Sequence, residues 1–128
     1  MTEELRRIVL VEDEPDIQEV ARLALEMVGG FEVTICGSGP EALDVIARDT
    51  PQLVLLDVML PGMDGPQILA QLRQRPEGAA LPVIFMTAKV QPGDVKRLSD
   101  LGPLDVIAKP FDPLTLAGTI RAIWEGRA

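Results

Sequence analysis

The sequence predicts an α/β fold in which one parallel five-stranded sheet carries helices on both faces. Five short apolar runs alternate with segments whose apolar residues recur at helical spacing, which is typical of strand–helix repeats. The runs are nearly continuous, as expected of parallel strands that are covered on both sides. The chain has 128 residues, 47% hydrophobic and 25% charged. We therefore expect residues 1–128 to form a single domain with a substantial core.

Each predicted strand is a short run rich in aliphatic or β-branched residues. The strands are expected at residues 7–11, 31–36, 53–57, 82–87 and 105–108.

The helices are expected between these strands. The first ends at Gly29-Gly30, and one face of it is expected to carry Ile17, Val20, Ala21, Ala24 and Val28. The next three are expected from Pro40 to about Arg48, at 65–74 and within 92–101. The helical pattern of the last is weak, because it contains Pro92, Gly93 and Ser99. Pro113 is expected to begin the final helix, whose apolar side holds Leu116, Ala117, Ile120, Ile123 and Trp124.

Composition excludes several classes of function. Twenty acidic residues against twelve basic ones give a net charge of −8, which opposes direct binding to nucleic acid or to an anionic membrane surface. The absence of histidine excludes a histidine-based triad, a histidine-ligated metal and a histidine phosphocarrier. No apolar run approaches the roughly 20 residues of a membrane span, and no secretory signal is visible. The single cysteine, Cys36, fits a buried inert thiol in a reducing cytoplasm, so a cytoplasmic protein is expected.

Polar residues follow four of the strands at the point where each apolar run stops. They are Glu12 and Asp13, Asp57, Thr87, and Lys109. Taken singly, each fits an ordinary role such as a helix N-terminus, a turn or a solvated surface. Parallel strands, however, bring their carboxyl ends to one edge, where ligands of such sheets bind. We therefore expect three carboxylates, a hydroxyl and an ammonium to converge there.

Crowded carboxylates repel one another, and a hard divalent cation such as Mg²⁺ relieves this. With the cation bound, Asp57 stays ionised and can act as a nucleophile toward a phosphoryl group. The cation, Lys109 and Thr87 could each engage one of the three phosphoryl oxygens.

The stretches "VEDEPD", "LLDVMLPGMDG", "PVIFMTA" and "AKPF" resemble the receiver (CheY-like) domain of two-component response regulators, over essentially the whole chain and in order. The resemblance implies a flavodoxin-like doubly wound sheet of order 2-1-3-4-5 with five flanking helices. It implies a phosphorelay switch in which Asp57 accepts a phosphoryl group from a phosphohistidine, forming 4-aspartylphosphate. Partners would be a sensor histidine kinase or phosphotransfer protein and an unidentified output partner or output domain.

The resemblance also implies roles for individual residues. Asp13, Asp57 and the backbone carbonyl of Met59 would ligate Mg²⁺ with help from Glu12, and Thr87 and Lys109 would sense the phosphoryl group. The family often has a cis bond before the proline of Lys109-Pro110. The chain would be a phosphoacceptor with only self-phosphorylation and self-dephosphorylation activity rather than an enzyme, either monomeric or dimeric on phosphorylation.

The chain departs from the family pattern at Val106, where the family usually has Tyr or Phe. We therefore expect a weaker or different switch around residues 88–106. Gly102-Pro103 stands where the family often has Gly-Ala, which suggests a locally mobile segment. Lys89 near the pocket mouth could influence hydrolysis, or could simply be solvated. The output face is expected to be formed by the fourth helix, the fifth strand and the fifth helix. Its candidate contributors are Lys96, Arg97, Val106 and Arg121.

Three alternatives remain open from the residues. Residues 37–42 fit G-x-G-x-x-A with Asp57 about 20 positions on, which permits a dinucleotide-binding domain, although Pro40 removes an amide that a pyrophosphate would use. An aspartyl phosphatase is a second alternative, but Met59 stands where such enzymes usually have a second Asp. A receiver that binds partners without phosphorylation is the third.

Overall fold

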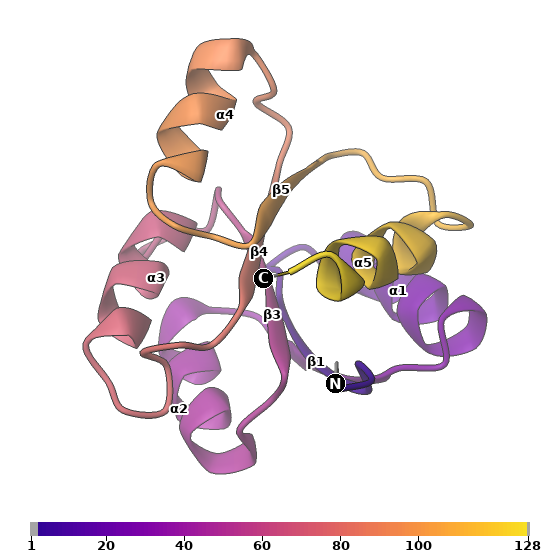
Figure 1. Ribbon diagram of the computed structural model, residues 1–128, viewed down its shortest axis with the longest axis horizontal. Helices are drawn as coiled ribbons and strands as arrows, with labels where there is room; N and C mark the ends of the chain where they lie inside the picture. Colours follow the sequence, from indigo (N-terminus) through magenta and orange to yellow (C-terminus); the bar gives the residue numbers. More distant parts are fainter. Residues whose placement is uncertain (1–2, 128) are drawn as a thin grey trace.

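The computed structural model describes residues 3–127 and has the expected layered α/β architecture (Figure 1). All strand pairs are parallel, and the order is β2-β1-β3-β4-β5, which confirms the order implied by the resemblance. The strands are β1 (Arg7–Val11), β2 (Glu32–Cys36), β3 (Leu53–Asp57), β4 (Val83–Thr87) and β5 (Asp105–Ala108). The second and fourth begin one residue later than predicted.

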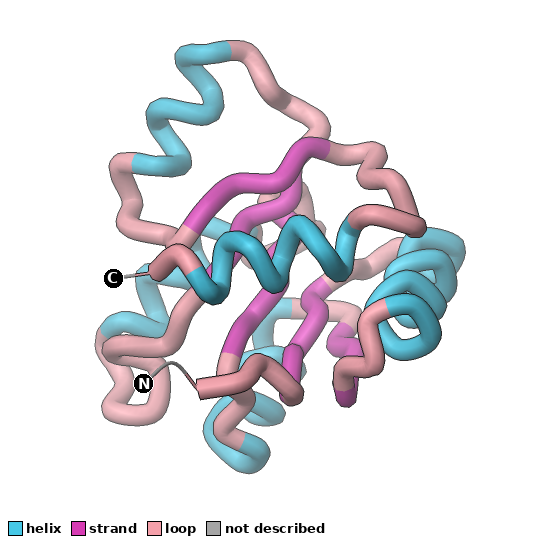
Figure 2. Tube along the Cα trace, turned by 45° about the vertical axis from the view of Figure 1, so that its right-hand side comes forward, coloured by secondary structure: helices cyan, strands magenta, loops and turns pink. Residues whose placement is uncertain are grey.

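Helices cover both faces of the sheet. They are α1 (Pro15–Leu23), α2 (Gly39–Asp49), α3 (Gly65–Arg73), α4 (Pro92–Ser99) and α5 (Leu116–Glu125). In Figure 1, α1 and α5 lie on one side of the strands, and α2, α3 and α4 lie on the other. Figure 2 shows α5 running across the sheet on the face that α1 also covers. The winding therefore reverses, as in a doubly wound fold.

The core is divided by the sheet into two apolar layers. Alternate residues of β3 point to opposite faces: Val54 and Leu56 pack with α2 and α3, whereas Leu53 and Leu55 pack with α1 and α5. All four side chains are fully buried. Burial on both faces explains why the strand reads as a continuous apolar run that ends only at Asp57.

The first helix differs from the prediction. After Leu23 the chain continues as a π-helical turn, η1 (Ala24–Val28). Ala21, Ala24 and Leu25 face the core, whereas Val20 and Val28 are 41% and 52% exposed. The prediction that Val20 and Val28 share the buried face was wrong, because the core face is centred on Ala21 and the wider turn brings Leu25 inward.

The last helix begins at Leu116, not at Pro113. The Asp112 carboxylate accepts a hydrogen bond from Leu114 N–H at 2.8 Å, and the Asp112 carbonyl accepts from Leu116 N–H at 3.0 Å. This aspartate-centred turn occupies the residues that the sequence assigned to the first helical turn.

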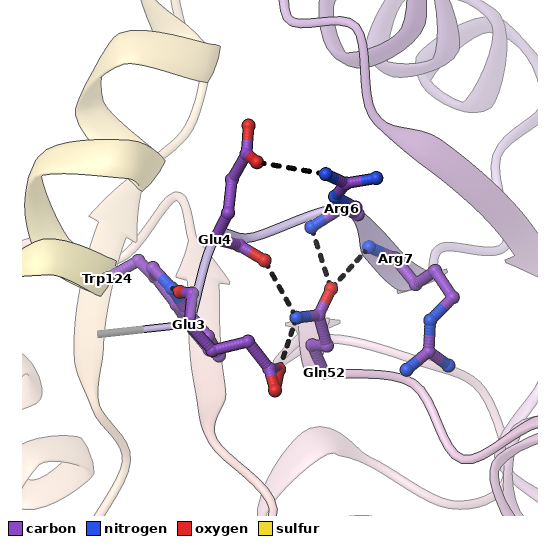
Figure 3. A network of polar contacts seen from close by, with 6 residues as sticks. All are labelled: Glu3, Glu4, Arg6, Arg7, Gln52 and Trp124. Atoms are coloured by element: carbon purple, nitrogen blue, oxygen red, sulfur yellow. Dashed lines mark hydrogen bonds and ion pairs between the residues drawn. The ribbon is translucent and has the colours of Figure 1, made fainter. Parts of the chain in front are cut away.

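The amino-terminal segment is fastened where β1 and β3 begin, at the opposite edge of the sheet from the predicted site. Figure 3 shows the polar contacts of this segment. The Gln52 side-chain oxygen accepts hydrogen bonds from the backbone N–H groups of Arg6 and Arg7, at 2.7 and 2.8 Å. Its amide group donates to the Glu3 carboxylate and to the Glu4 carbonyl. The Trp124 indole of α5 donates to the Glu3 carbonyl at 2.6 Å. Residues 3–7 thus tie β1, β3 and α5 together. Among residues 3–127, no helix is both long and apolar enough to cross a membrane.

Candidate metal centre at the carboxyl edge of the sheet

Three carboxylates meet at the carboxyl edge of β1 and β3. Glu12, Asp13 and Asp57 each offer an oxygen, and these oxygens all lie within 4.8 Å of one another. The sheet register explains the convergence, because Val11 of β1 lies opposite Leu56 of β3 and the next residues continue from adjacent strands. Glu12 and Asp57 are buried, at 2% and 5% exposed, and Asp13 is half-buried.

Lys109 lies against this cluster. Its Nζ atom is 2.8 Å from Oε1 of Glu12 and 3.3 Å from Oδ2 of Asp57. The residue follows β5, and its backbone N–H donates to the Thr87 carbonyl at 2.8 Å. The Lys109-Pro110 peptide bond is cis, as the resemblance implied.

The electrostatics of Lys109 follow from two opposing effects. Burial of the ammonium lowers its pKa, while the hydrogen bond to Glu12 and the charges of Asp57 and Glu12 raise it by more. The net pKa lies above the usual value for lysine, so Lys109 is positively charged at neutral pH.

The Asp57 carboxylate is also held by the backbone that follows it. Its Oδ1 atom accepts a hydrogen bond from Met59 N–H at 3.2 Å, which sets the Met59 backbone beside the carboxylate. The Val58 N–H donates to Met86 O, and the Gly65 N–H donates to Val58 O, both at 3.0 Å. The turn after β3 is therefore fixed to β4 on one side and to the start of α3 on the other.

Thr87 ends β4, the strand next to β3, and is 1% exposed. Its hydroxyl oxygen accepts a hydrogen bond from Lys89 N–H at 3.0 Å. A cleft of about 400 Å³ opens beside it, lined by Val58, Met59, Lys89 and Leu98 among others. Thr87 lies on one side of this cleft and α4 on the other. Leu98 is the one buried side chain of α4, so few core contacts hold this helix in place.

The donor set fits a hard divalent cation. The three carboxylates that meet here offer oxygen, the ligand that Mg²⁺ prefers. Three carboxyl groups outnumber the single ammonium beside them, so a divalent cation would offset the acidic excess. An acidic group of this composition is typical of the magnesium site of receiver domains.

Other predicted residues have structural roles that the sequence did not indicate. The Ser38 hydroxyl caps α2 by accepting from Glu41 N–H, and Gly37 N–H donates to the Glu41 carboxylate, so the glycine-containing motif forms a helix cap. Arg121 does not face α4 and β5: its guanidinium donates to Gly29 O and lies 4.4 Å from the Phe31 ring centroid. The prediction that Arg121 contributes to the output face was wrong. Gln18, which no motif singled out, donates to the Glu12 carbonyl at 2.6 Å.

The fold and this site define a class of protein: a doubly wound α/β domain with an acidic cluster at the edge where the strands end. Residues 8–121 match the family model described as the response regulator receiver domain. The chain is 37% identical over 114 residues to the response regulator Rre1 of Synechocystis sp., covering 89% of this chain and 49% of that protein. It is 43% identical over 115 residues to the transcriptional regulatory protein YkoG of Bacillus subtilis, covering 90% of this chain and 49% of that protein.

Among solved structures, the chemotaxis response regulator CheY4 of Vibrio cholerae superposes with a TM-score of 0.85 at 23% identity, over 94% of this chain and 99% of that one, which supports the fold. The chain belongs to the response regulator receiver domain family of two-component signal transduction, whose members partner histidine kinases. It spans about half the length of Rre1 and of YkoG.

Proposed function

We propose that this chain is a phosphorylation-dependent switch in which Asp57 accepts a phosphoryl group from a phosphohistidine of a partner. The observation that carries the proposal is the buried Asp57 carboxylate, grouped with Glu12 and Asp13 and contacted by Lys109. A charged carboxylate at the end of a buried strand is costly unless it is compensated. A role in phosphoryl transfer accounts for all four residues together.

In the proposed reaction, one oxygen of Asp57 forms a bond to phosphorus while the bond between phosphorus and the histidine nitrogen breaks. The electron pair of the broken bond leaves with the imidazole nitrogen. Glu12, Asp13, Asp57 and the Met59 carbonyl would hold Mg²⁺, and the cation would supply charge neutralisation and orientation. Lys109 moves only a short distance from Asp57 to pair with a phosphoryl oxygen, and Thr87 can turn its hydroxyl from the Lys89 amide toward another.

The same geometry explains why the chain is proposed as a phosphoacceptor rather than a phosphatase. Met59 occupies the position two residues after Asp57, where an aspartyl phosphatase usually has a second acid. Its side chain is 61% exposed and carries no titratable group. Self-phosphorylation by small phosphodonors and self-dephosphorylation are the expected activities.

Transmission from the site is proposed to run from Thr87 across the adjacent cleft to α4. Leu98 is the only buried residue of α4, and Leu101 beyond it is 47% exposed. Val106 of β5 is half-buried against the core layer of α2 and α3 and has no ring to reorient. We therefore propose that the conformational change on phosphorylation occurs in the backbone segment 88–106 rather than as a side-chain rotation at Val106.

Output partners are proposed from the relatives. Because the chain spans about half of Rre1 and YkoG, residues 1–128 are proposed to form one receiver domain that acts on an output partner or output domain. A phosphohistidine-bearing kinase or phosphotransfer protein is the proposed donor, and phosphorylation-linked dimerisation is a further proposed response.

Phosphorylation with phosphoramidate tests the proposal. Intact mass is expected to rise by about 80 Da, one phosphoryl group, only when Mg²⁺ is present. The Asp57→Asn variant keeps nearly the same shape and is expected to gain nothing, while Asp64→Asn, at the cap of α3, is the matched carboxylate control and should label normally. Equal labelling of the Asp57→Asn variant would remove Asp57 from its proposed role.

A further inference from the structure

We propose that Gln18 is a positioning residue for the metal centre: its side-chain amide fixes the peptide that joins Glu12 to Asp13. This inference rests on the proposed function and adds a residue that binds neither the cation nor the phosphoryl group. Gln18 lies in the second turn of α1 and is half-buried. Its Nε2 atom donates to the Glu12 carbonyl at 2.6 Å, a contact that reaches back six residues.

The acidic turn needs such a tie because α1 lacks the usual one. Glu14 stands at the N-cap and makes no side-chain capping bond within the described helix, and Pro15 has no N–H to donate. A capping side chain normally fastens the incoming loop to its helix. Here the Gln18 amide connects the helix to the loop instead.

Glu12 is held at every polar group. Its N–H donates to Cys36 O at 3.0 Å, one carboxylate oxygen accepts from Glu14 N–H at 3.1 Å, and the other meets Lys109. Gln18 holds the remaining group, the carbonyl.

Asp13 is in a different situation. Within residues 3–127, no hydrogen bond to the Asp13 carboxylate is found, so the backbone before it sets its place. The Glu12 carbonyl and the Asp13 N–H belong to one rigid peptide plane. Rotation of that plane would swing the Asp13 side chain away from Asp57. The cluster depends on the carboxylate oxygens of both residues staying within 4.8 Å of one another.

The Gln18 amide also lies near the end of β2. A Cβ atom added to Gly37, the residue after β2, would lie 3.8 Å from Gln18 Nε2, so the amide has room beside the end of that strand. Through its bond to the Glu12 carbonyl, the side chain thus bridges α1 and the acidic turn. A preorganised turn loses less freedom when a cation binds, and loss of the tie should weaken binding without altering Asp57, Thr87 or Lys109.

The test compares Gln18→Met, which keeps the length and removes the donor, with Gln71→Met, an exposed glutamine on α3. Isothermal titration of Mg²⁺ alone is expected to give a dissociation constant about fivefold higher for Gln18→Met, the factor of one ordinary hydrogen bond. Gln71→Met should match the wild type. Gln18→Asn, whose amide is one methylene too short, should lose as much as Gln18→Met.

A second readout separates positioning from a general loss of structure. With phosphoramidate, the Mg²⁺ concentration for half-maximal rate should rise by the same factor, while the rate at saturating Mg²⁺ stays at the wild-type value. Unchanged Mg²⁺ affinity in either Gln18 variant, or a lowered rate at saturation with unchanged affinity, would overturn the inference. Failure of the wild type to bind Mg²⁺ or to label at Asp57 would instead overturn the proposed function.

Discussion

Lys109 Nζ lies 2.8 Å from Glu12 Oε1, although the two residues are 97 positions apart in the sequence. The Glu12 side chain is buried, at 2% exposed, and the Lys109 side chain is partly buried, at 14% exposed. The ammonium is therefore the countercharge that the structure provides for carboxylates that would otherwise repel one another. It also competes with a cation for the same oxygens, so its removal should change stability and metal affinity in opposite directions.

We expect Lys109→Met to destabilise the metal-free protein by about 2–4 kcal/mol, because an acidic cluster remains without its partner. Mg²⁺ affinity should rise, since a positive charge near the site is gone, and phosphorylation by phosphoramidate should slow. Urea unfolding in chelator, Mg²⁺ titration and mass spectrometry measure the three quantities. Lys96→Met removes an exposed ion pair with Asp100 and should change stability by less than about 1 kcal/mol. Weaker Mg²⁺ binding in Lys109→Met would contradict the competition argument.

The Thr87 hydroxyl should control the response of the segment 88–106. Beryllofluoride stands in for the phosphoryl group on Asp57, and its addition should shift the backbone amide signals of that segment. Thr87→Val keeps the shape and loses the hydroxyl, so the shifts in 88–106 should shrink while those of the turn at Val58 and Met59 persist. Thr87→Ser, which keeps the hydroxyl, should resemble the wild type. Equal shifts in the Val variant would show that Thr87 does not carry the change.

The site could be predicted in outline because parallel strands place their following residues at one edge. Glu12, Asp13, Asp57 and Lys109 follow apolar runs, and the structure brings them together. The strand order came from the resemblance, since periodicity identifies strands but does not tell which are neighbours. The binding roles of these residues stay predictions that the experiments above test.

Contacts that depend on the exact path of the chain could not be predicted from the sequence. The π-helical turn at Ala24–Val28 has no local signal, because its apolar spacing also fits an α-helix. Gln18 looks like any polar residue on a helix, and only the path of the turn brings its amide to Glu12. Arg121 was placed by helix position alone, whereas Gly29 and Phe31 on the other side determine where it points.

Gly65 should tolerate no side chain, although it lies in a helix. A Cβ there would lie 2.8 Å from Asp57 O and 2.9 Å from Val58 Cα, and these are backbone atoms that cannot step aside. Gly65→Ala should lower the free energy of unfolding by about 1–3 kcal/mol and slow labelling at Asp57. Gly118→Ala in α5 is the control, since nothing lies within 4 Å, and it should raise stability by up to about 1 kcal/mol. Urea unfolding compares the two; equal effects would mean that the close approach at Gly65 is unimportant.

Cys36 should make the protein less stable at alkaline pH. Burial, together with the negative charge of Glu41, raises the pKa of its thiol to about 12. In the unfolded chain the thiol ionises near pH 8.5. Between these values the folded state retains a proton that the unfolded state releases, so the free energy of unfolding falls as pH rises, by at most about 1.4 kcal/mol per pH unit. Below about pH 8 the thiol is protonated in both states, so its contribution to the free energy of unfolding is fully present.

Urea unfolding at pH 8 and pH 10 measures this loss, with Cys36→Ala as the comparison because it has no group to ionise. The variant is expected to be less stable at both pH values, since it leaves a small cavity in a fully buried site. The wild type, however, should lose about 2 kcal/mol more than the variant between the two pH values. Other titrating groups, including Lys109, are common to both proteins and cancel in the difference. Parallel losses in the two proteins would mean that the Cys36 thiol ionises as readily in the folded state as in the unfolded one.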